Sequence, residues 1–251
     1  MTRFAWPIMF CVAAVVAMRI TELRSADRAL ARKTCLFAIA GGILGARGWF
    51  SAQYGLGASG MSSYGFAMGA VLVAVLYRRL RLGRWDIGDL ADAAAPAILM
   101  GAALVRVGCF IHGCCYGKPS DLPWAVSYGP STPAYASQLK LGVISGAAAS
   151  SLPVHPTQLY EGFFVAALCG AVLAKGRSLP LPRYCVFLLS VALYATFRFF
   201  VEFIRGDAGG FRFGPLTFAQ TTSLAVLVAA VWLMAWRFSA ERRVRAREAT
   251  A

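Results

Sequence analysis

The chain has 251 residues, of which 59% are hydrophobic and only 14% are charged, and its mean hydropathy is +0.62. This balance excludes an ordinary soluble globular domain. Several apolar stretches approach the roughly 20 residues that cross a bilayer as a helix, while the period-two alternation of a membrane barrel is not evident. We therefore predict an all-α integral membrane protein with a helical-bundle fold.

The net charge of +14 raises the question of nucleic-acid binding. The arginines and lysines, however, cluster mainly in a few connections between apolar stretches. The positive-inside rule and the attraction of anionic lipid headgroups account for basic residues at such places. We expect contact with membrane lipid and no nucleic-acid partner.

Seven apolar segments predict seven transmembrane helices, at about 4–18, 35–52, 61–77, 91–111, 156–174, 184–204 and 216–236. The first is short and follows the single basic residue Arg3, as the apolar core of a signal peptide would. No small-x-small cleavage site with a polar mature start follows it. We therefore predict a retained span, whose short length would fit an incomplete N-terminus.

Basic residues predict the orientation of this bundle. They follow the first, third, fifth and seventh predicted spans: Arg19, Arg24, Arg28, Arg32 and Lys33; Arg78, Arg79, Arg81 and Arg84; Lys175, Arg177 and Arg183; Arg237, Arg242, Arg243, Arg245 and Arg247. Because basic connections stay in the cytoplasm, the N-terminus should face outward and the C-terminus inward. The prediction is one membrane domain over 1–251, with an outer-face loop or small head at 112–155 and a basic cytoplasmic tail at 237–251.

Three arginines do not follow this pattern, because Arg47, Arg106 and Arg198 fall within predicted spans. A lipid-facing guanidinium costs at least a few kcal/mol, so each should be buried in the bundle or in a wet cavity. Glu202 could neutralise Arg198 at i, i+4. We expect the bundle's few acids not to balance all three arginines, which favours an anionic ligand such as a phosphate.

Motifs along most of the chain resemble the prolipoprotein diacylglyceryl transferase family. Gly45-Ala-Arg-Gly48 and Gly60-Met-Ser-Ser-Tyr-Gly65 are similar to its elements in the second and third spans. The family signature Arg-x-Gly-Asn-Phe-x-Asn-Gly, then Trp-Gly-Arg-Pro and Asp-Leu-Pro-Trp, resembles the run from Arg106 to Val126. His155-Pro-Thr-Gln-Leu-Tyr-Glu161 and Arg198-Phe-Phe-Val-Glu-Phe203 resemble its His-Pro-Ser-Gln-Leu-Tyr-Glu and Arg-Phe-x-x-Glu-Phe.

The resemblance implies transfer of the diacylglyceryl group of phosphatidylglycerol to the cysteine thiol of a prolipoprotein, with release of glycerol phosphate. It implies a multi-pass enzyme of the bacterial cytoplasmic (inner) membrane, without metal or organic cofactor, that binds the prolipoprotein signal peptide. Because a seven-helix bundle can enclose its own cavity, we expect a monomer. The catalytic residues implied are Arg106, Arg198, Tyr64 and Glu202, with Glu202 orienting Arg198. Those implied at the substrate are Arg47, Gly117, His155, Gln158, Tyr160 and Glu161.

The chain departs from the family pattern at the residues that carry proton and thiol chemistry. Tyr64 stands where the family has a histidine, and a phenol with a reference pKa near 10 is a poor base at neutral pH. Cys109 replaces an asparagine, Cys114 replaces a glutamate, and Cys115 adds a third thiol. The alternatives are a divergent paralogue with another lipid-group transfer or a thiol-based reaction, or a non-catalytic phospholipid-binding protein.

The three thiols have several interpretations from sequence alone. In an oxidising compartment Cys109 can pair with Cys114 or Cys115, whereas a bridge between the adjacent Cys114 and Cys115 is geometrically awkward. A reactive thiolate favoured by Arg106 is the second interpretation. A metal site that includes His112 is the third, but the compact spacing is unlike that of a structural zinc site.

The two histidines also have structural interpretations. His155 precedes Pro156 at the start of the fifth span, where we expect an interfacial helix cap. Glu161 lies near the same helix N-terminus, which favours a negative charge. His112 is close in sequence to Arg106 and is a candidate substitute for the missing base.

Overall fold

The computed structural model describes the backbone of residues 2–56, 63–80, 87–207 and 212–248, with side chains throughout except at residues 2–6, 53, 54, 63, 64, 78 and 87–89. Within these ranges the long helices are α1 (Thr2–Arg24), α2 (Arg28–Tyr54), α3 (Ser63–Leu80), α4 (Ile87–His112), α6 (Thr157–Lys175), α7 (Cys185–Val201) and α8 (Phe218–Glu248). The described part of each predicted span lies almost entirely within one of these helices.

The shorter elements lie near the ends of the long helices. They are α5 (Pro133–Lys140), the 3₁₀ helix η1 (Glu202–Ile204), and the strands β1 (Arg212–Phe213) and β2 (Leu216–Thr217). The strands form an antiparallel hairpin in which Arg212 pairs with Thr217. The all-α prediction is confirmed apart from this hairpin and a few isolated bridges.

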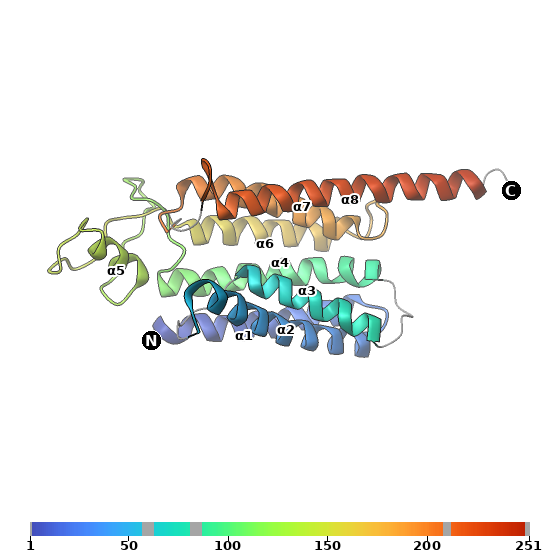
Figure 1. Ribbon diagram of the computed structural model, residues 1–251, viewed down its shortest axis with the longest axis horizontal. Helices are drawn as coiled ribbons and strands as arrows, with labels where there is room; N and C mark the ends of the chain where they lie inside the picture. Colours follow the sequence, from blue (N-terminus) through green and yellow to red (C-terminus); the bar gives the residue numbers. More distant parts are fainter. Residues whose placement is uncertain (1, 57–62, 81–86, 208–211, 249–251) are drawn as a thin grey trace.

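The long helices run side by side along the long axis of the molecule (Figure 1). α1 packs against α4, α2 against α3, and α7 against α8, while α4 also packs against α6. The α4–α6 contact is therefore the main connection between the α1–α4 group and the α6–α8 group. The N-terminus lies at the end where α5 projects, and the C-terminus lies at the opposite end (Figure 1).

The main hydrophobic core fills the space between α4, α6 and α7. Leu99 and Ala103 of α4 pack with Val165 and Cys169 of α6 and with Val186 of α7, all of them buried. Most of these side chains are small, so the helices approach closely and gain dispersion contacts, which drive helix association where apolar burial alone cannot.

Glycines bring α2 and α3 into direct backbone contact. A Cβ atom on Gly45 would lie 2.3 Å from the carbonyl oxygen of Gly65, and one on Gly69 would lie 2.2 Å from that of Gly41. Each helix thus carries two glycines four residues apart, the small-xxx-small pattern that membrane helices use for close packing. Gly45 and Gly65, singled out in the sequence motifs, are residues of helix packing.

The end of the bundle opposite α5 has its own polar anchor. Asp92 of α4 accepts hydrogen bonds from the backbone N–H groups of Tyr184 and Phe187, at 3.0 and 2.8 Å. A carboxylate at a helix N-terminus satisfies donors that the helix itself leaves without partners. Asp92 therefore caps α7 from a neighbouring helix.

Five helices of the described chain are long and apolar enough to cross a membrane, within Arg28–Ala52, Leu90–His112, Thr157–Lys175, Cys185–Ile204 and Phe218–Glu248, and Gly65–Tyr77 is a shorter apolar helix. Large apolar side chains lie exposed on the outside of the bundle, including Leu44, Phe163 and Trp232. Such a surface fits contact with lipid. The last helix continues beyond the predicted end at residue 236, through the basic segment to Glu248.

The segment between α4 and α6 forms a small head around α5 (Figure 1). Tyr116, Tyr128, Ala134 and Val154 form its buried core. Thr132 caps α5 by accepting a hydrogen bond from the backbone N–H of Tyr135. The head predicted for residues 112–155 is therefore ordered, with a core of its own.

The tight α2–α3 contact predicts different effects for two glycines on one helix. Gly45→Ala should lower stability by about 1–3 kcal/mol, because the added methyl group meets a backbone oxygen that cannot rotate away. Gly48→Ala is the matched control, since a Cβ there has open space around it. Thermal unfolding in detergent measures both. Equal midpoints for the two variants would contradict this packing.

Candidate functional site at the head end of the bundle

A buried ion pair joins α4 to α6 at the head end of the bundle. Arg106 Nη2 donates a hydrogen bond to Oε1 of Glu161 at 2.5 Å, and the hydroxyl of Tyr194 on α7 donates to the same oxygen at 2.6 Å. The side chain of Glu161 is 2% exposed and that of Arg106 is 19% exposed. Three helices thus meet at one carboxylate, and the guanidinium keeps part of its surface open.

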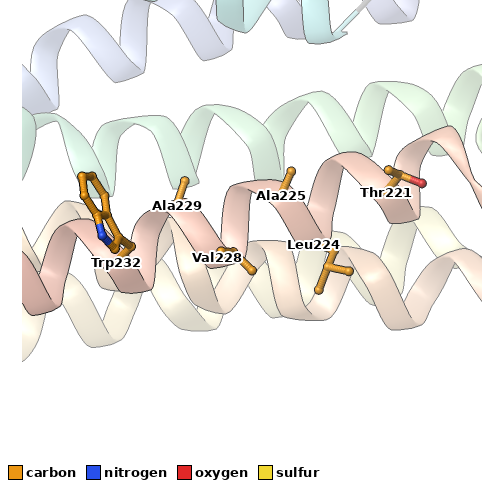
Figure 2. Close-up of a pocket in the computed structure, with 6 residues that line it drawn as sticks. All are labelled: Thr221, Leu224, Ala225, Val228, Ala229 and Trp232. Atoms are coloured by element: carbon orange, nitrogen blue, oxygen red, sulfur yellow. The ribbon is translucent and has the colours of Figure 1, made fainter.

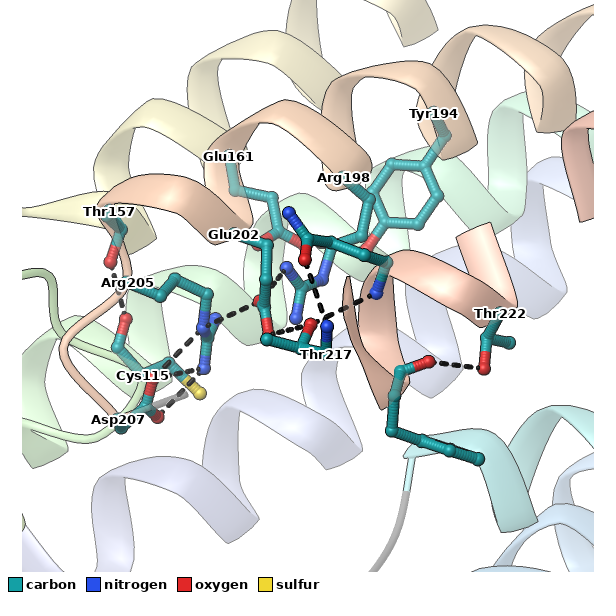
Figure 3. Close-up of polar contacts among 12 residues, drawn as sticks. Cys115, Thr157, Glu161, Tyr194, Arg198, Glu202, Arg205, Asp207, Thr217 and Thr222 are labelled. Atoms are coloured by element: carbon teal, nitrogen blue, oxygen red, sulfur yellow. Dashed lines mark hydrogen bonds and ion pairs between the residues drawn. The ribbon is translucent and has the colours of Figure 1, made fainter. Parts of the chain in front are cut away.

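A second arginine–carboxylate group lies beside it (Figure 3). Arg198 Nη1 donates to Oε2 of Glu202 at 2.6 Å, and Thr217 donates its hydroxyl to Oε1 at 3.0 Å. Arg205 Nε lies 3.6 Å from the same Oε2. Glu202 therefore links α7, η1 and β2, as the i, i+4 spacing from Arg198 predicts for the first of these contacts.

These contacts correct the charge argument made from the sequence. Arg106 and Arg198 each have a carboxylate partner. The prediction that the bundle has too few acids to balance its arginines is therefore wrong for these two. Arg47 is exposed on α2, which contradicts its predicted burial. It lies two residues from Gly45 on the helix, and residues at that spacing point in different directions, so the glycine face packs on α3 without it.

Arg205 connects this pair to the head. Its guanidinium donates to both oxygens of Asp207, at 2.9 and 2.8 Å, in the bidentate geometry that arginine and carboxylate favour. Burial raises the pKa of the Asp207 carboxyl, while Arg205 opposes that rise. Figure 3 shows this pair next to Cys115.

The three thiols of the 106–117 stretch converge at the end of α4. Cys109, Cys114 and Cys115 are free in the structure, and their sulfur atoms all lie within 4.8 Å of one another. Hydrogen bonds with the thiols of Cys109 and Cys114, together with the charges of Arg106 and Arg205, lower the pKa of the Cys115 thiol against the effect of burial. His112 does not belong to this cluster, and its buried Nδ1 has no hydrogen-bond partner among the residues that the structure describes.

The first turn of α6 holds the backbone of these cysteines. Gln158 Nε2 donates to the carbonyl oxygen of Cys114 at 2.7 Å, and the hydroxyl of Thr157 donates to that of Cys115 at 2.7 Å. Thr157 and Gln158 are each 1% exposed. Gln158, predicted to contact substrate, thus contacts the loop that carries the thiols.

Gly117 fixes the position of that loop between two other segments. Its N–H donates to the carbonyl of His155 at 2.9 Å, and the next N–H, of Lys118, donates to that of Ile204 at 2.8 Å. A Cβ on Gly117 would lie 2.5 Å from the Cβ of His155 and 2.9 Å from the oxygen of Ile204. The close approach expected at this glycine is therefore to the protein's own backbone.

The His155 side chain takes part in a polar group at the edge of the head. Its Nδ1 lies 3.3 Å from the hydroxyl of Tyr160, which accepts a hydrogen bond from Nε1 of Trp124 at 2.7 Å. The predicted capping role of His155 is wrong, because Pro156 is the N-cap of α6 and no side chain caps it. The ring is used in a contact with Tyr160 instead.

Two further parts of the chain bear on the site prediction. Tyr64 lies in α3, but its side chain is outside the described part of the structure. An apolar groove of about 540 Å³ runs along α8, with the lining shown in Figure 2: Thr221, Leu224, Ala225, Val228, Ala229 and Trp232. This lining carries no ionisable group, so the polar chemistry lies at the head end.

Several residues of the site were not predicted from the sequence. Tyr194, Arg205 and Thr217 contact predicted site residues, and Asp207 contacts Arg205. Arg205 could have been found from its i, i+3 spacing to Glu202. Tyr194 and Thr217 reach their carboxylates through tertiary packing, which no local spacing indicates.

The fold and the site together define a helical-bundle membrane protein whose arginine–glutamate pairs lie at one end of the helices, next to a small head. A family model described as prolipoprotein diacylglyceryl transferase matches residues 4–236. The chain belongs to this family.

Curated relatives agree with this assignment. The chain is 32% identical to a phosphatidylglycerol–prolipoprotein diacylglyceryl transferase of Azotobacter vinelandii over 188 residues, which cover 74% of this chain and 64% of the relative. Proteins of the same name from Clostridium tetani and Methylococcus capsulatus are 30% and 32% identical, with 63% and 61% of their lengths covered and 70% of this chain in each case. The matched region thus spans less than two thirds of these relatives.

Proposed function

We propose that this protein transfers the diacylglyceryl group of phosphatidylglycerol to the lipobox cysteine of a prolipoprotein. In this reaction a carbon–sulfur bond forms at the glycerol carbon, and the carbon–oxygen bond to the phosphate breaks. Glycerol phosphate leaves, and the thiol loses its proton. The relatives with this name and the two arginine–glutamate pairs at the head end support the proposal.

The observation that carries it is the pairing of Arg106 with Glu161 and of Arg198 with Glu202 at that end. A guanidinium has five N–H donors, so one held by a carboxylate can still donate to a phosphate. Each glutamate fixes the direction of its arginine before substrate arrives, which is the preorganisation that stabilises developing charge. Arg106 and Arg198 would thus bind the phosphate that gains charge as it leaves.

The other residues of the site take different places. Gly117 and Gln158 hold the thiol-bearing loop in place, and Glu161 orients Arg106 together with Tyr194, so these four position the site. His155 and Tyr160 lie at the edge of the head, where a peptide or a headgroup could contact them. Arg47, exposed on α2, remains a proposed contact of the lipid.

The proton of the acceptor thiol needs a destination, because Tyr64 is a poor base at neutral pH. A phosphate monoester has a second pKa near 6, so the leaving glycerol phosphate can carry a proton away at moderately acidic pH. In this scheme Tyr64 donates a hydrogen bond to a phosphate oxygen and removes no proton.

We propose that seven spans cross the bacterial inner membrane, with the N-terminus and the head outside and the C-terminus in the cytoplasm. α1 and α8 place the two termini at opposite ends of the bundle (Figure 1). Arg24, Lys175 and Arg245 lie at helix ends away from the head, as the positive-inside rule favours. A bundle of this size can enclose its own site, so we propose a monomer.

The proposed topology predicts the side of the membrane on which the head and the C-terminal tail are cleaved. A protease site added after Ala251 should be cut only in inverted membrane vesicles. A site inserted at Gly142, in the exposed head, should be cut only in spheroplasts. Immunoblotting of both preparations measures this. Cleavage of both sites from one side would exclude the three spans proposed between the head and the C-terminus.

The phosphate-binding proposal predicts that Arg106→Ala and Arg198→Ala each reduce transfer about 100-fold or more, the usual effect of losing one preorganised donor. The assay incubates purified protein with phosphatidylglycerol and a lipobox peptide and follows the peptide's mass. Arg245→Ala is the control, because that arginine is 75% exposed on the tail of α8. Arg106→Lys keeps the charge opposite Glu161 and should still lose most activity, because it lacks the planar fork. Full activity in either alanine variant would contradict the proposal.

The departure at Tyr64 predicts that Tyr64→His preserves or raises transfer, since imidazole has a reference pKa near 6.5 and can accept the thiol proton. Tyr64→Phe, which removes only the hydroxyl, separates hydrogen bonding from ring packing. Rates across pH 5 to 9 are the measurement. If Tyr64→His abolishes transfer that the unchanged protein performs, the phenol of Tyr64 has a specific role.

A further inference from the structure

The contacts assigned above to the proposed transfer do not use the thiols of Cys109, Cys114 and Cys115. Two of these residues follow α4, and the third lies in its last turn, yet their sulfur atoms all lie within 4.8 Å of one another. Cys109 is 3% exposed, while Cys114 and Cys115 keep part of their surface open. The cluster is therefore formed by the fold and remains partly accessible through Cys114 and Cys115.

The backbone takes an unusual path to bring the third sulfur into the cluster. Gly113 has φ +77°, and Cys115 has φ +61°, a left-handed conformation that side chains other than glycine rarely adopt. Such conformations persist only where the surroundings enforce them, and they concentrate at functional sites. Here Gln158 and Thr157 hold the carbonyls of Cys114 and Cys115, so α6 fixes the backbone that carries both thiols.

Three convergent thiols fit a metal ion better than they fit a disulfide. A disulfide uses two sulfur atoms, which would leave the strained third cysteine without a purpose. Zn(II) binds thiolate sulfur at about 2.3 Å, which places sulfur atoms about 3.8–4.0 Å apart. Small side-chain rotations would bring sulfur atoms within 4.8 Å to that separation. From the sequence, the compact spacing of these cysteines argued against a structural zinc site. That spacing rule applies to closed sites with four protein ligands.

The surroundings favour the charge of such a site. Zn(II) with three thiolates carries one negative charge overall, and the guanidinium groups of Arg106 and Arg205 both act on Cys115. Sites with three protein ligands keep a fourth position for water or substrate. The cluster therefore lies close to Arg106, one of the two arginines assigned to the phosphate.

We propose that Cys109, Cys114 and Cys115 bind one Zn(II) ion, and that its fourth position takes the acceptor cysteine as a thiolate. The second half of this proposal rests on the proposed function. A thiol that coordinates zinc gives up its proton to solvent as it binds, which replaces the later transfer of that proton to the leaving glycerol phosphate. The metal thus does the work for which Tyr64 is poorly suited. The bound sulfur attacks the glycerol carbon, the carbon–oxygen bond breaks, and glycerol phosphate leaves. The thioether formed is neutral and a weaker ligand than a thiolate, so the product dissociates.

Metal content tests the site without reference to activity. Protein purified in detergent under anaerobic, reducing conditions is dialysed with Zn(II) and analysed for bound metal. We expect one zinc per chain, and at least a tenfold weaker affinity in Cys109→Ser, Cys114→Ser and Cys115→Ser. Cys35→Ser is the matched control, because that cysteine lies in α2. Unchanged binding in the three variants, or a disulfide among these cysteines in untreated protein, would overturn the site.

Co(II) in place of Zn(II) tests the acceptor position. Thiolate coordination gives Co(II) an intense charge-transfer absorption, so binding of a fourth sulfur is visible directly. A lipobox peptide with its cysteine should increase this absorption, and the same peptide with serine should not. Identical spectra with both peptides would overturn the acceptor role.

The two proposals fail in different ways. Metal binding that needs the three cysteines, without any transfer from phosphatidylglycerol, would support the metal site and contradict the proposed function. Transfer that persists in the presence of a chelator and in the three serine variants would support the proposed function and overturn the metal proposal.

Discussion

The buried pair between Arg106 and Glu161 is the contact on which the site depends. It lies at the head end of the α4–α6 interface, which is the main contact between the two groups of long helices. Removing one partner of such a pair leaves an uncompensated buried charge, which costs about 3–5 kcal/mol. Tyr194 bonds to the same carboxylate and ties α7 to this point. One ion pair therefore serves helix assembly and the direction of a guanidinium together.

The head depends on the same end of the bundle. The backbone around Gly117 is hydrogen-bonded on one side to His155, before α6, and on the other to Ile204, after α7. Segments far apart in sequence thus form one small layer above the helices. The consequence is that Cys115 and Arg205 lie together, and that the first turn of α6 holds both the thiol loop and Glu161.

Apolar patterning was sufficient to predict where the helices lie, because each long helix must cover its backbone with an apolar surface in a membrane. The sequence motifs also identified Arg106, Arg198, Glu202 and Glu161, which the structure brings to one end. What could not be predicted was which partner each of these residues meets. Glu161 was interpreted through its own helix N-terminus, whereas its charge is balanced by an arginine 55 residues away. Gly117 was assigned to substrate, yet its missing side chain makes room for the chain's own backbone.

The departures from the family pattern make sense together. The position at Tyr64 gives up a base that titrates near neutral pH, and the stretch from Cys109 to Cys115 gains three thiols. The three soft ligands compensate for the lost base if a metal, and not imidazole, deprotonates the acceptor thiol. The arginines and glutamates of the two pairs match the family motifs, which fits the proposed phosphate leaving group in either case. Chemistry at the sulfur can therefore change while chemistry at the phosphate stays fixed.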